Sequence, residues 1–228
     1  MRVAEIYRSV QGEGLLAGTP SAFLRVSGCN LRCWFCDTPY ASWHPEGDDL
    51  APDDILAQLE PLGLEHVVIT GGEPLLFAEL VPLCHALRDR QKHVTIETAG
   101  TLHLPLACNL MSISPKLANS APQQATHAQW YRRHEQTRHM PHVIRQLIRE
   151  HVYQFKFVVD QPHDLPEVAS YLLEFPEIDR SRVMLMPQGT TLGQLAATAE
   201  WLEPACAELG YRFCPRYQIE WFGLSRGT

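Results

Sequence analysis

Three cysteines stand close together in the run Cys-Asn-Leu-Arg-Cys-Trp-Phe-Cys, at Cys29, Cys33 and Cys36. A structural zinc site takes four protein ligands, usually two pairs of cysteines separated by a longer loop, and this chain has no second pair. Three thiolates can instead bind three irons of a cubane iron–sulfur cluster and leave the fourth iron open to an exogenous chelating group. The loop therefore predicts a cluster with one open iron. A zinc site, with His44 as the nearby fourth ligand, is the alternative.

The other four cysteines show no comparable spacing. Cys84 and Cys108 stand alone in apolar stretches, and Cys206 precedes Cys214 across a predicted helix and strand. We expect all four to be small buried apolar side chains. A total of seven cysteines is odd and shows no disulfide-like pattern, which favours a reducing compartment and predicts a cytoplasmic protein.

Composition and charge limit the classes of function. The chain has 228 residues, 45% of them hydrophobic, which predicts one domain with a substantial core. A net charge of −7 argues against nucleic acid or an anionic membrane as a partner, so we expect a small-molecule substrate. The sequence contains neither the apolar region of a signal peptide nor the roughly 18 apolar residues that a membrane helix needs.

Apolar β-branched runs alternate with amphipathic stretches along the chain, which is typical of a parallel sheet. The predicted strands are Ala22–Gly28, His66–Thr70, His93–Thr98, Leu110–Ser114, Tyr153–Val159, Arg182–Pro187 and Tyr211–Pro215. The predicted helices are Asp53–Leu62, Leu76–Arg90, Pro141–Val152, Leu165–Phe175 and Leu192–Leu209. About six βα units must share the chain with a long N-terminal loop, whereas a complete eight-unit barrel takes about 250 residues. The pattern predicts an α/β fold, an open partial (β/α) barrel formed by a single domain over residues 1–228, with ligands at the carboxyl ends of its strands.

One polar segment interrupts this alternation, from Lys116 to Met140, and we interpret residues 117–140 as an insertion. Its histidines, His127, His134 and His139, share no helical face, so a metal site is not indicated. We expect a solvated loop that acts as a mobile flap.

A glycine turn, Thr70-Gly71-Gly72-Glu73-Pro74, follows the second predicted strand. Adjacent glycines allow backbone conformations and close approaches that other residues forbid. Exposed amides there, together with the Glu73 carboxylate, could bind the ammonium group of a methionine-like cofactor whose amino and carboxylate groups chelate the open iron.

The cysteine loop and the Gly-Gly-Glu-Pro turn together resemble the radical S-adenosylmethionine enzymes. The resemblance implies that Cys29, Cys33 and Cys36 bind a [4Fe-4S] cluster. It also implies that S-adenosylmethionine chelates the unique iron and that one electron cleaves it to methionine and a 5′-deoxyadenosyl radical. Phe35, before the last cysteine, is expected beside the adenine.

Further local motifs are similar to those of one family among these enzymes, the 7-carboxy-7-deazaguanine synthases. They are Ser9-Val10-Gln11-Gly12-Glu13-Gly14, Arg25, Cys36-Asp37-Thr38, Glu97-Thr98, Ser114-Pro115-Lys116 and, more loosely, Met186-Pro187-Gln188-Gly189. The implied residues for S-adenosylmethionine are Phe35, Cys36, Asp37, Gly72, Glu73, Glu97, Ser114, Pro115, Lys116 and Gln188. The implied residues for the substrate are Gln11, Gly12, Glu13, Arg25 and Thr70. Thr38 is the implied contact to Mg²⁺.

The resemblance implies ring contraction of 6-carboxy-5,6,7,8-tetrahydropterin to 7-carboxy-7-deazaguanine with loss of ammonia, a step toward queuosine and other deazapurines. Glu13 suits the amino-pyrimidine donors of that substrate, and Arg25 suits its carboxylate, preferably as a bidentate pair. A flavodoxin or ferredoxin as reductant and a homodimer are also implied. The electron donor and the final deazapurine are not encoded in this chain.

Several alternatives stay open at this stage. Glu13 could be only a turn residue, and Arg25 could form a structural pair with Glu97. The cysteine loop is shared with radical activases, which act on a partner enzyme, and a zinc-binding interaction module is a third class. The C-terminal tail lacks the histidine-containing ending of some relatives, so Arg226 is a hypothetical substrate contact in its place.

Overall fold

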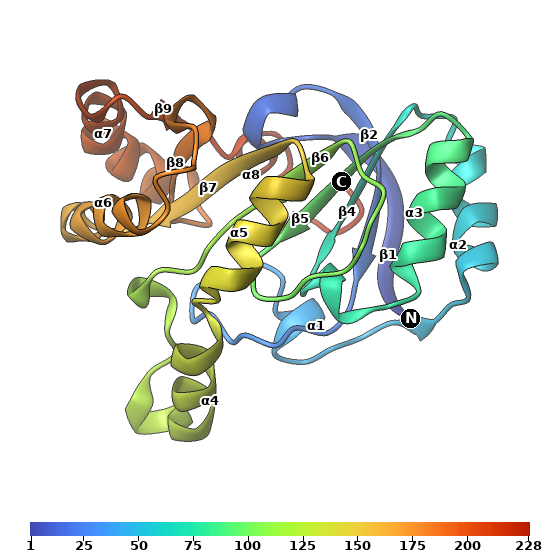
Figure 1. Ribbon diagram of the computed structural model, residues 1–228, viewed down its shortest axis with the longest axis horizontal. Helices are drawn as coiled ribbons and strands as arrows, with labels where there is room; N and C mark the ends of the chain where they lie inside the picture. The colour runs from blue at the N-terminus through green and yellow to red at the C-terminus, as the bar shows by residue number, and fades with distance from the viewer.

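A single open sheet forms the body of the computed structural model, which describes residues 1–228 (Figure 1). The nine strands lie in the order β3-β1-β2-β4-β5-β6-β7-β8-β9, and the two edge strands do not pair with each other. The strands are β1 (Arg2–Val10), β2 (Pro20–Val26), β3 (Asp48–Asp49), β4 (His66–Gly71), β5 (His93–Thr98), β6 (Leu110–Ile113), β7 (Tyr153–Val159), β8 (Val183–Pro187) and β9 (Arg212–Phe213).

From β2 to β9 every neighbouring pair of strands is parallel. These strands carry near-continuous apolar runs because helices bury one face and side chains fill the other. Leu24, Ile69, Ile96 and Phe155, on β2, β4, β5 and β7, are each completely buried. The predicted open partial barrel is confirmed, and its strands end together at one edge.

The predicted helices also form, close to the expected limits. They are α2 (Pro52–Leu59), α3 (Leu80–Asp89), α5 (Pro141–Glu150), α6 (Leu165–Glu174) and α7 (Leu192–Leu209), with two short helices, α1 (Pro39–Ser42) and α8 (Tyr217–Phe222). In Figure 1, α2 and α3 lie beside β1 at one end of the sheet, and α6 and α7 lie near β8 and β9 at the other. None of the helices is both long and apolar enough to cross a membrane.

The predicted long N-terminal loop is wrong, because residues 2–10 form β1. This strand pairs antiparallel with β2, and its register shifts between Val3 and Glu5. The irregularity breaks the alternation of buried and exposed positions by which a half-buried strand is identified. The end of β1 lies beside Pro20, where β2 begins, so the Gln11 to Glu13 segment starts at the edge of the sheet opposite the carboxyl ends of the parallel strands. From there Glu13 reaches Lys156 of β7.

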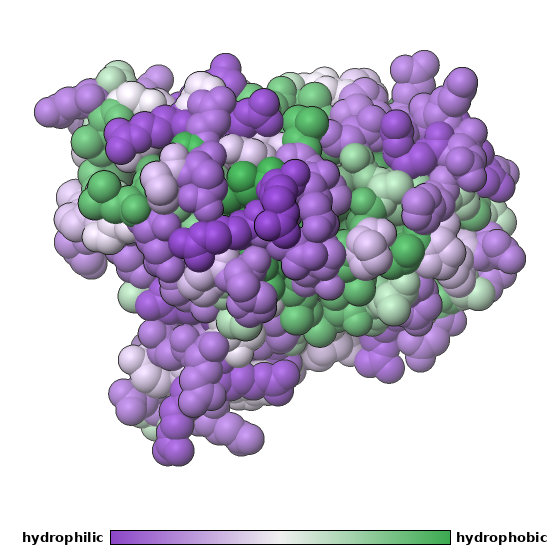
Figure 2. Space-filling model, in the orientation of Figure 1, coloured by the Kyte–Doolittle hydropathy of each residue, from purple (hydrophilic) through white to green (hydrophobic).

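The expected solvated loop in the insertion is also wrong. The segment forms a short turn of helix, η4 (Ala118–Ser120), and the 14-residue helix α4 (Gln124–Thr137), which is kinked at His127. His134 is only 1% exposed, and its burial lowers the pKa of the ring to about 4. Helix α4 projects from the body at the lower left of Figure 1, and the same region of Figure 2 is almost entirely hydrophilic. A polar helix of this kind depends on a few tertiary contacts, so it lacks the apolar periodicity that would predict it.

The cysteines outside the loop behave as apolar side chains. Cys84, Cys206 and Cys214 are buried as expected, whereas Cys108 is half-buried with its sulfur 3.6 Å from His151 Nδ1. Burial raises the pKa of Cys84 and Cys108 to about 12, so both thiols stay protonated near neutral pH.

Candidate active site

One cavity opens at the carboxyl ends of the parallel strands and extends to the cysteine loop. Its lining includes most of the residues predicted from sequence: Gln11, Gly12, Glu13, Arg25, Cys29, Cys33, Phe35, Cys36, Asp37, Thr38, Thr70, Gly72, Glu97, Ser114, Lys116 and Gln188. These residues come from segments far apart in the chain. Most lie at or after the carboxyl ends of the parallel strands, whereas Gln11, Gly12 and Glu13 follow the antiparallel strand β1 and reach the cavity from the opposite edge. Glu73 and Pro115 are the two predicted residues that do not line the cavity.

The Glu73 carboxylate is fully buried beneath the cavity. It accepts hydrogen bonds from Thr98 Oγ1 at 2.8 Å, from the Ala99 amide at 2.8 Å and from the Leu75 amide at 3.1 Å. Burial raises the pKa of Glu73, with these hydrogen bonds opposing the effect. The side chain ties the loops after β4 and β5 together, and its expected contact with a cofactor stays a prediction.

The glycine turn packs directly against the start of the cysteine loop. A Cβ at Gly72 would lie 2.0 Å from the Gly28 carbonyl oxygen, and Gly71 has a φ of +122°. The Glu73 amide donates to the same Gly28 carbonyl at 2.8 Å. Only glycine at these two positions allows both turns to share this edge of the sheet.

The cysteine loop presents three half-buried free thiols to the cavity. The Leu31 amide donates to Cys29 Sγ at 3.4 Å, and Cys36 Sγ lies 3.1 Å from Ser42 Oγ. Burial raises the pKa of Cys29 and Cys33 to about 12. Soft sulfur ligands that face a cavity and receive hydrogen bonds fit an iron–sulfur cluster, whose positive charge would ionise the thiols.

The zinc alternative lacks its fourth ligand. His44 is exposed and does not line the cavity. No group of three or more His, Cys, Asp and Glu side chains is arranged to hold a single metal ion.

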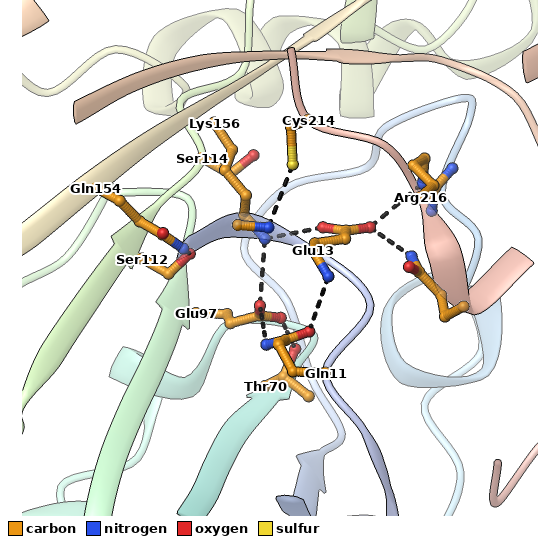
Figure 3. A network of polar contacts seen from close by, with 12 residues as sticks. Gln11, Glu13, Thr70, Glu97, Ser112, Ser114, Gln154, Lys156, Cys214 and Arg216 are labelled. Atoms are coloured by element: carbon orange, nitrogen blue, oxygen red, sulfur yellow. Dashed lines mark hydrogen bonds and ion pairs between the residues drawn. The ribbon is translucent and has the colours of Figure 1, made fainter. Parts of the chain in front are cut away.

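The opposite wall of the cavity is a network of ion pairs (Figure 3). Lys156, from β7, is 3% exposed and lies between two carboxylates. Its Nζ is 2.8 Å from Glu13 Oε2 and 3.2 Å from Glu97 Oε1. Burial alone would lower the pKa of Lys156, but Glu13 and Glu97 more than offset it and raise the pKa. The lysine is thus a fixed positive charge shared by both carboxylates.

Arg216, just after β9, is the second cation of this network. Its Nε lies 3.3 Å from Glu13 Oε1, its Nη1 donates to the Gly189 carbonyl at 2.6 Å, and its Nη2 pairs with Asp37. Burial disfavours the charge on Glu13, but Lys156 and Arg216 outweigh it and hold the pKa of Glu13 below its usual value. Glu13 therefore faces the cavity as a carboxylate, and Arg216 connects it to the end of the cysteine loop.

Glu97 and Thr70 belong to the same network. The Thr70 hydroxyl donates to Glu97 Oε2 at 2.8 Å, and Gln11 Nε2 donates to Glu97 Oε1 at 3.3 Å. Gln11 and Thr70, which the resemblance implies for the substrate, are thus in direct contact with Glu97, which it implies for the cofactor.

Arg25 lines the cavity but does not pair with Glu97. Its Nε pairs with Glu5 and its Nη2 donates to Tyr7 Oη, so the structural alternative named the wrong partner. Tyr40 Oη also donates to Glu5, at 2.8 Å. The remaining guanidinium N–H groups are available to a ligand.

The sequence motifs missed Lys156, Arg216 and Gln218, which all contact Glu13, and the two tyrosines beside Arg25. For Lys156 one signal was present in the sequence. It is the only charged residue of the strand Tyr-Gln-Phe-Lys-Phe-Val-Val, and a buried lysine requires a partner of opposite charge. Arg216 and Gln218 follow a two-residue strand and had no pattern that could identify them.

The C-terminal tail closes one side of the cavity, with Gly223, Leu224, Ser225 and Thr228 in the lining. Arg226 itself is not part of the lining. Its Nη1 pairs with Glu46 at 2.9 Å, and its guanidinium lies 3.5 Å from the centre of the Tyr40 ring. This placement gives no support to the hypothesis that Arg226 approaches the substrate, which stays a prediction.

The same fold and sequence pattern occur in known proteins. A family model described as "Radical SAM superfamily" matches residues 24–117. The chain is 48% identical to a 7-carboxy-7-deazaguanine synthase of Rhodopirellula baltica, over 99% of this chain and 88% of that protein, and 42% identical to one of Halobacterium salinarum, over 95% and 88%. The crystal structure of QueE from Escherichia coli has a TM-score of 0.69 at 22% identity, over 94% of this chain and 92% of that one, which supports the fold. At this level of identity over nearly its whole length, the chain belongs to the 7-carboxy-7-deazaguanine synthase family of radical SAM enzymes.

Proposed function

We propose that this chain catalyses the ring contraction of 6-carboxy-5,6,7,8-tetrahydropterin to 7-carboxy-7-deazaguanine, with loss of ammonia, in queuosine and related deazapurine biosynthesis. One observation carries the proposal: three cysteine thiols and a preassembled set of charged residues line the same cavity. Relatives with 48% and 42% identity bear the name of this activity.

The cysteine side would hold the cofactors of the family. Cys29, Cys33 and Cys36 would hold the [4Fe-4S] cluster. S-adenosylmethionine would lie against Phe35, Gly72, Glu97, Ser114, Lys116 and Gln188, all of which line the cavity. When bound, the two cofactors supply the removal of a hydrogen atom from the substrate. Lys116 Nζ is held by the carbonyl and hydroxyl oxygens of Ser114 at 2.6 and 2.8 Å, so its charge points to a fixed place at the strand end.

The charged side would orient the pterin. Glu13 is ionised and accepts hydrogen bonds, which suits the amino-pyrimidine edge, and Lys156 and Arg216 hold it in place. Arg25 retains free N–H groups in the cavity, which suit the substrate carboxylate. Holding a substrate in one orientation can contribute about 7–11 kcal/mol to the rate of a reaction.

Thr38 would contact Mg²⁺. Its hydroxyl lies in the cavity lining, two residues after Cys36. Mg²⁺ prefers oxygen ligands and keeps several waters, so one hydroxyl plus substrate oxygens forms a plausible sparse site.

The assembly would consist of single-domain subunits paired as a homodimer and reduced by a flavodoxin or ferredoxin. One continuous core of 37 buried residues, from Met1 to Cys206, supports a single domain. Tyr217 and Trp221 of α8 stack at 5.2 Å and are 36% and 42% exposed, which supports an intersubunit contact beside the cavity.

The direct test is the fate of the hydrogen on C6 of the pterin. The reconstituted protein would be incubated without oxygen with S-adenosylmethionine, a reductant, Mg²⁺ and substrate deuterated at C6. We expect deuterium in the 5′-deoxyadenosine that forms. Unlabelled 5′-deoxyadenosine accompanying the deazaguanine would show that the hydrogen comes from elsewhere and would contradict the proposed substrate orientation. Glu13→Gln is the matched variant, expected to keep the cluster while losing the deazaguanine product.

A further inference from the structure

The insertion, residues 117–140, contacts the cysteine loop rather than only solvent. The short turn η4 and the helix α4 both accept hydrogen bonds from residues of the loop: η4 from Trp34 and α4 from Arg32. These contacts have no part in the function proposed for the cavity, because no residue of α4 lines it.

His134 is the centre of the contact. Its Nδ1 accepts the Arg32 amide N–H at 3.3 Å, and its Nε2 lies 2.9 Å from Ser120 Oγ. The ring is neutral because burial lowers its pKa, so Nδ1 is free to accept. A buried backbone amide needs such an acceptor, and Arg32 directly precedes the ligand Cys33.

Trp130 holds the side chain of the same arginine. The Arg32 guanidinium lies 3.9 Å from the centre of the Trp130 ring, and its Nη1 donates to the carbonyls of Cys29 and Leu31 at 2.8 and 2.7 Å. Arg32 is 8% exposed, so the ring shields a largely buried cation. Helix α4 is thus bonded to the Arg32 amide and, through the Arg32 guanidinium, connected to the backbone at Cys29 and Leu31.

Two tryptophans, Trp34 within the loop and Trp43 at the end of α1, add further contacts. The Trp34 amide donates to the Ser120 carbonyl at 3.1 Å, and Trp34 Nε1 donates to the Asn119 carbonyl at 2.7 Å. Trp43 Nε1 donates to the Cys33 carbonyl at 2.9 Å, and its ring centre is 4.9 Å from that of His127. The loop is thus held on both sides of Cys33.

We propose that the insertion is a clamp that sets the positions of the cysteine ligands and thereby the retention of the iron–sulfur cluster, with His134 and Trp130 as its positioning residues. The inference rests on the proposed function only in requiring that the loop binds a cluster. Removal of groups that hydrogen-bond to metal ligands and orient them typically lowers metal affinity by about 10- to 100-fold.

The test measures iron release, not turnover. The chain with its cluster reconstituted would be mixed without oxygen with a ferrous chelator, and the rate of iron loss would be followed in wild type, His134→Phe, His134→Gln and Trp130→Ala. We expect about tenfold faster loss in His134→Phe and Trp130→Ala, whereas His134→Gln, whose amide oxygen can accept the Arg32 N–H, restores part of the wild-type rate. Arg132→Ala, an exposed residue of the same helix, should release iron like wild type.

The unfolding temperature of each cluster-free variant separates the clamp from general destabilisation. The Gln and Phe variants at position 134 both remove the imidazole, so a difference between their iron-loss rates at equal unfolding temperature supports the clamp. Iron loss at the wild-type rate in both His134→Phe and Trp130→Ala would overturn the inference while leaving the proposed function intact. A wild-type protein that takes up no iron and sulfide would overturn both.

Discussion

The two walls of the cavity are the cysteine loop on one side and the ion-pair network around Glu13 on the other. They differ in how far the protein alone stabilises the ionised form of their side chains. On the cysteine wall, burial raises the pKa of Cys29 and Cys33 to about 12; the charge of Glu73 adds to the effect at Cys29, and the charge of Lys116 opposes it at Cys33 without offsetting it. On the opposite wall, Lys156 and Arg216 already neutralise Glu13, whose pKa is lowered.

This difference assigns separate requirements to the two walls. Cys29 and Cys33 would ionise when they bind a metal cluster, as metal-binding thiols generally do. The charged wall is assembled by the protein alone and is ready to orient a polar substrate. Substitutions on the cysteine wall should therefore abolish 5′-deoxyadenosine formation. Substitutions on the charged wall should mainly reduce the formation of the deazaguanine product.

The largest expected effect is on the cysteine wall. Cys33→Ala should abolish cluster binding and all 5′-deoxyadenosine formation, because the remaining two thiols cannot hold the cluster. Iron and acid-labile sulfide analysis checks the first result and anaerobic product analysis the second. Cys108→Ala, a half-buried cysteine outside the cavity, is the control and should keep a full cluster. Cluster binding by Cys33→Ala would refute the ligand assignment.

Lys156→Met should have the next largest effect. It leaves Glu13 and Glu97 without their shared cation, and breaking a buried pair in this way costs about 3–5 kcal/mol of unfolding free energy. We also expect at least about a 100-fold loss of deazaguanine formation, because the groups that orient the substrate lose their positions.

Urea unfolding and product formation measure the two effects of Lys156→Met. Adding Glu13→Gln to Lys156→Met should recover part of the stability, since it removes a buried charge that has lost one of its two cations and keeps only Arg216. A single variant as stable as wild type would show that the lysine does not hold this wall together.

The pH dependence of stability isolates Glu13. Because its pKa is lowered in the folded state, its contribution is complete above the unfolded value of about 4.3 and is lost as the pH falls through the folded value. Lys156, whose pKa is raised, contributes fully below its unfolded value of about 10.4 and is lost only at higher pH, so it does not change in acid. Urea midpoints between pH 6 and pH 3 should fall more steeply for wild type than for Glu13→Gln. Parallel curves would mean that Glu13 is not held as a carboxylate by its neighbours.

Arg226→Ala should have the smallest effect. Arg226 and Glu46 form an exposed pair outside the cavity lining, and such pairs contribute little in water. Turnover should stay within about twofold of wild type. Lys116→Ala, within the lining, is the contrasting variant and should reduce it much more; a large loss in Arg226→Ala would place that side chain at the substrate.

The parts of the site that the sequence predicted are those encoded by short, local motifs. The cysteine loop and the Gln11 to Glu13 segment are contiguous in the chain, and their residue types limit their chemistry. The alternation of strands and helices then predicted the sheet edge at which the cysteine loop lies, but not the path of the Gln11 to Glu13 segment, which starts at the opposite edge. Lys156 and Arg216 could not be paired with Glu13 in this way, because their contacts depend on strand register and span 143 and 203 residues of sequence.

The two errors in the fold have a similar origin. Strand β1 carries an irregular register between Val3 and Glu5, which hides its alternation. Helix α4 is polar and is held through Trp130 and His134, whose partner Arg32 lies about a hundred residues away in sequence. The burial of Glu73 could not be predicted, because a carboxylate in a glycine turn can face inward as easily as outward, and only the fold decides which.

The most direct measurement of the whole account is the ratio of 5′-deoxyadenosine to 7-carboxy-7-deazaguanine in an anaerobic reaction of the reconstituted protein with S-adenosylmethionine, reductant, Mg²⁺ and 6-carboxy-5,6,7,8-tetrahydropterin. If both walls serve one reaction, the two products should form together, and only when the pterin is present. 5′-Deoxyadenosine without deazaguanine would keep the chemistry of the cysteine wall and contradict the substrate assigned to the charged wall. Neither product from protein with a verified cluster would contradict the account of both.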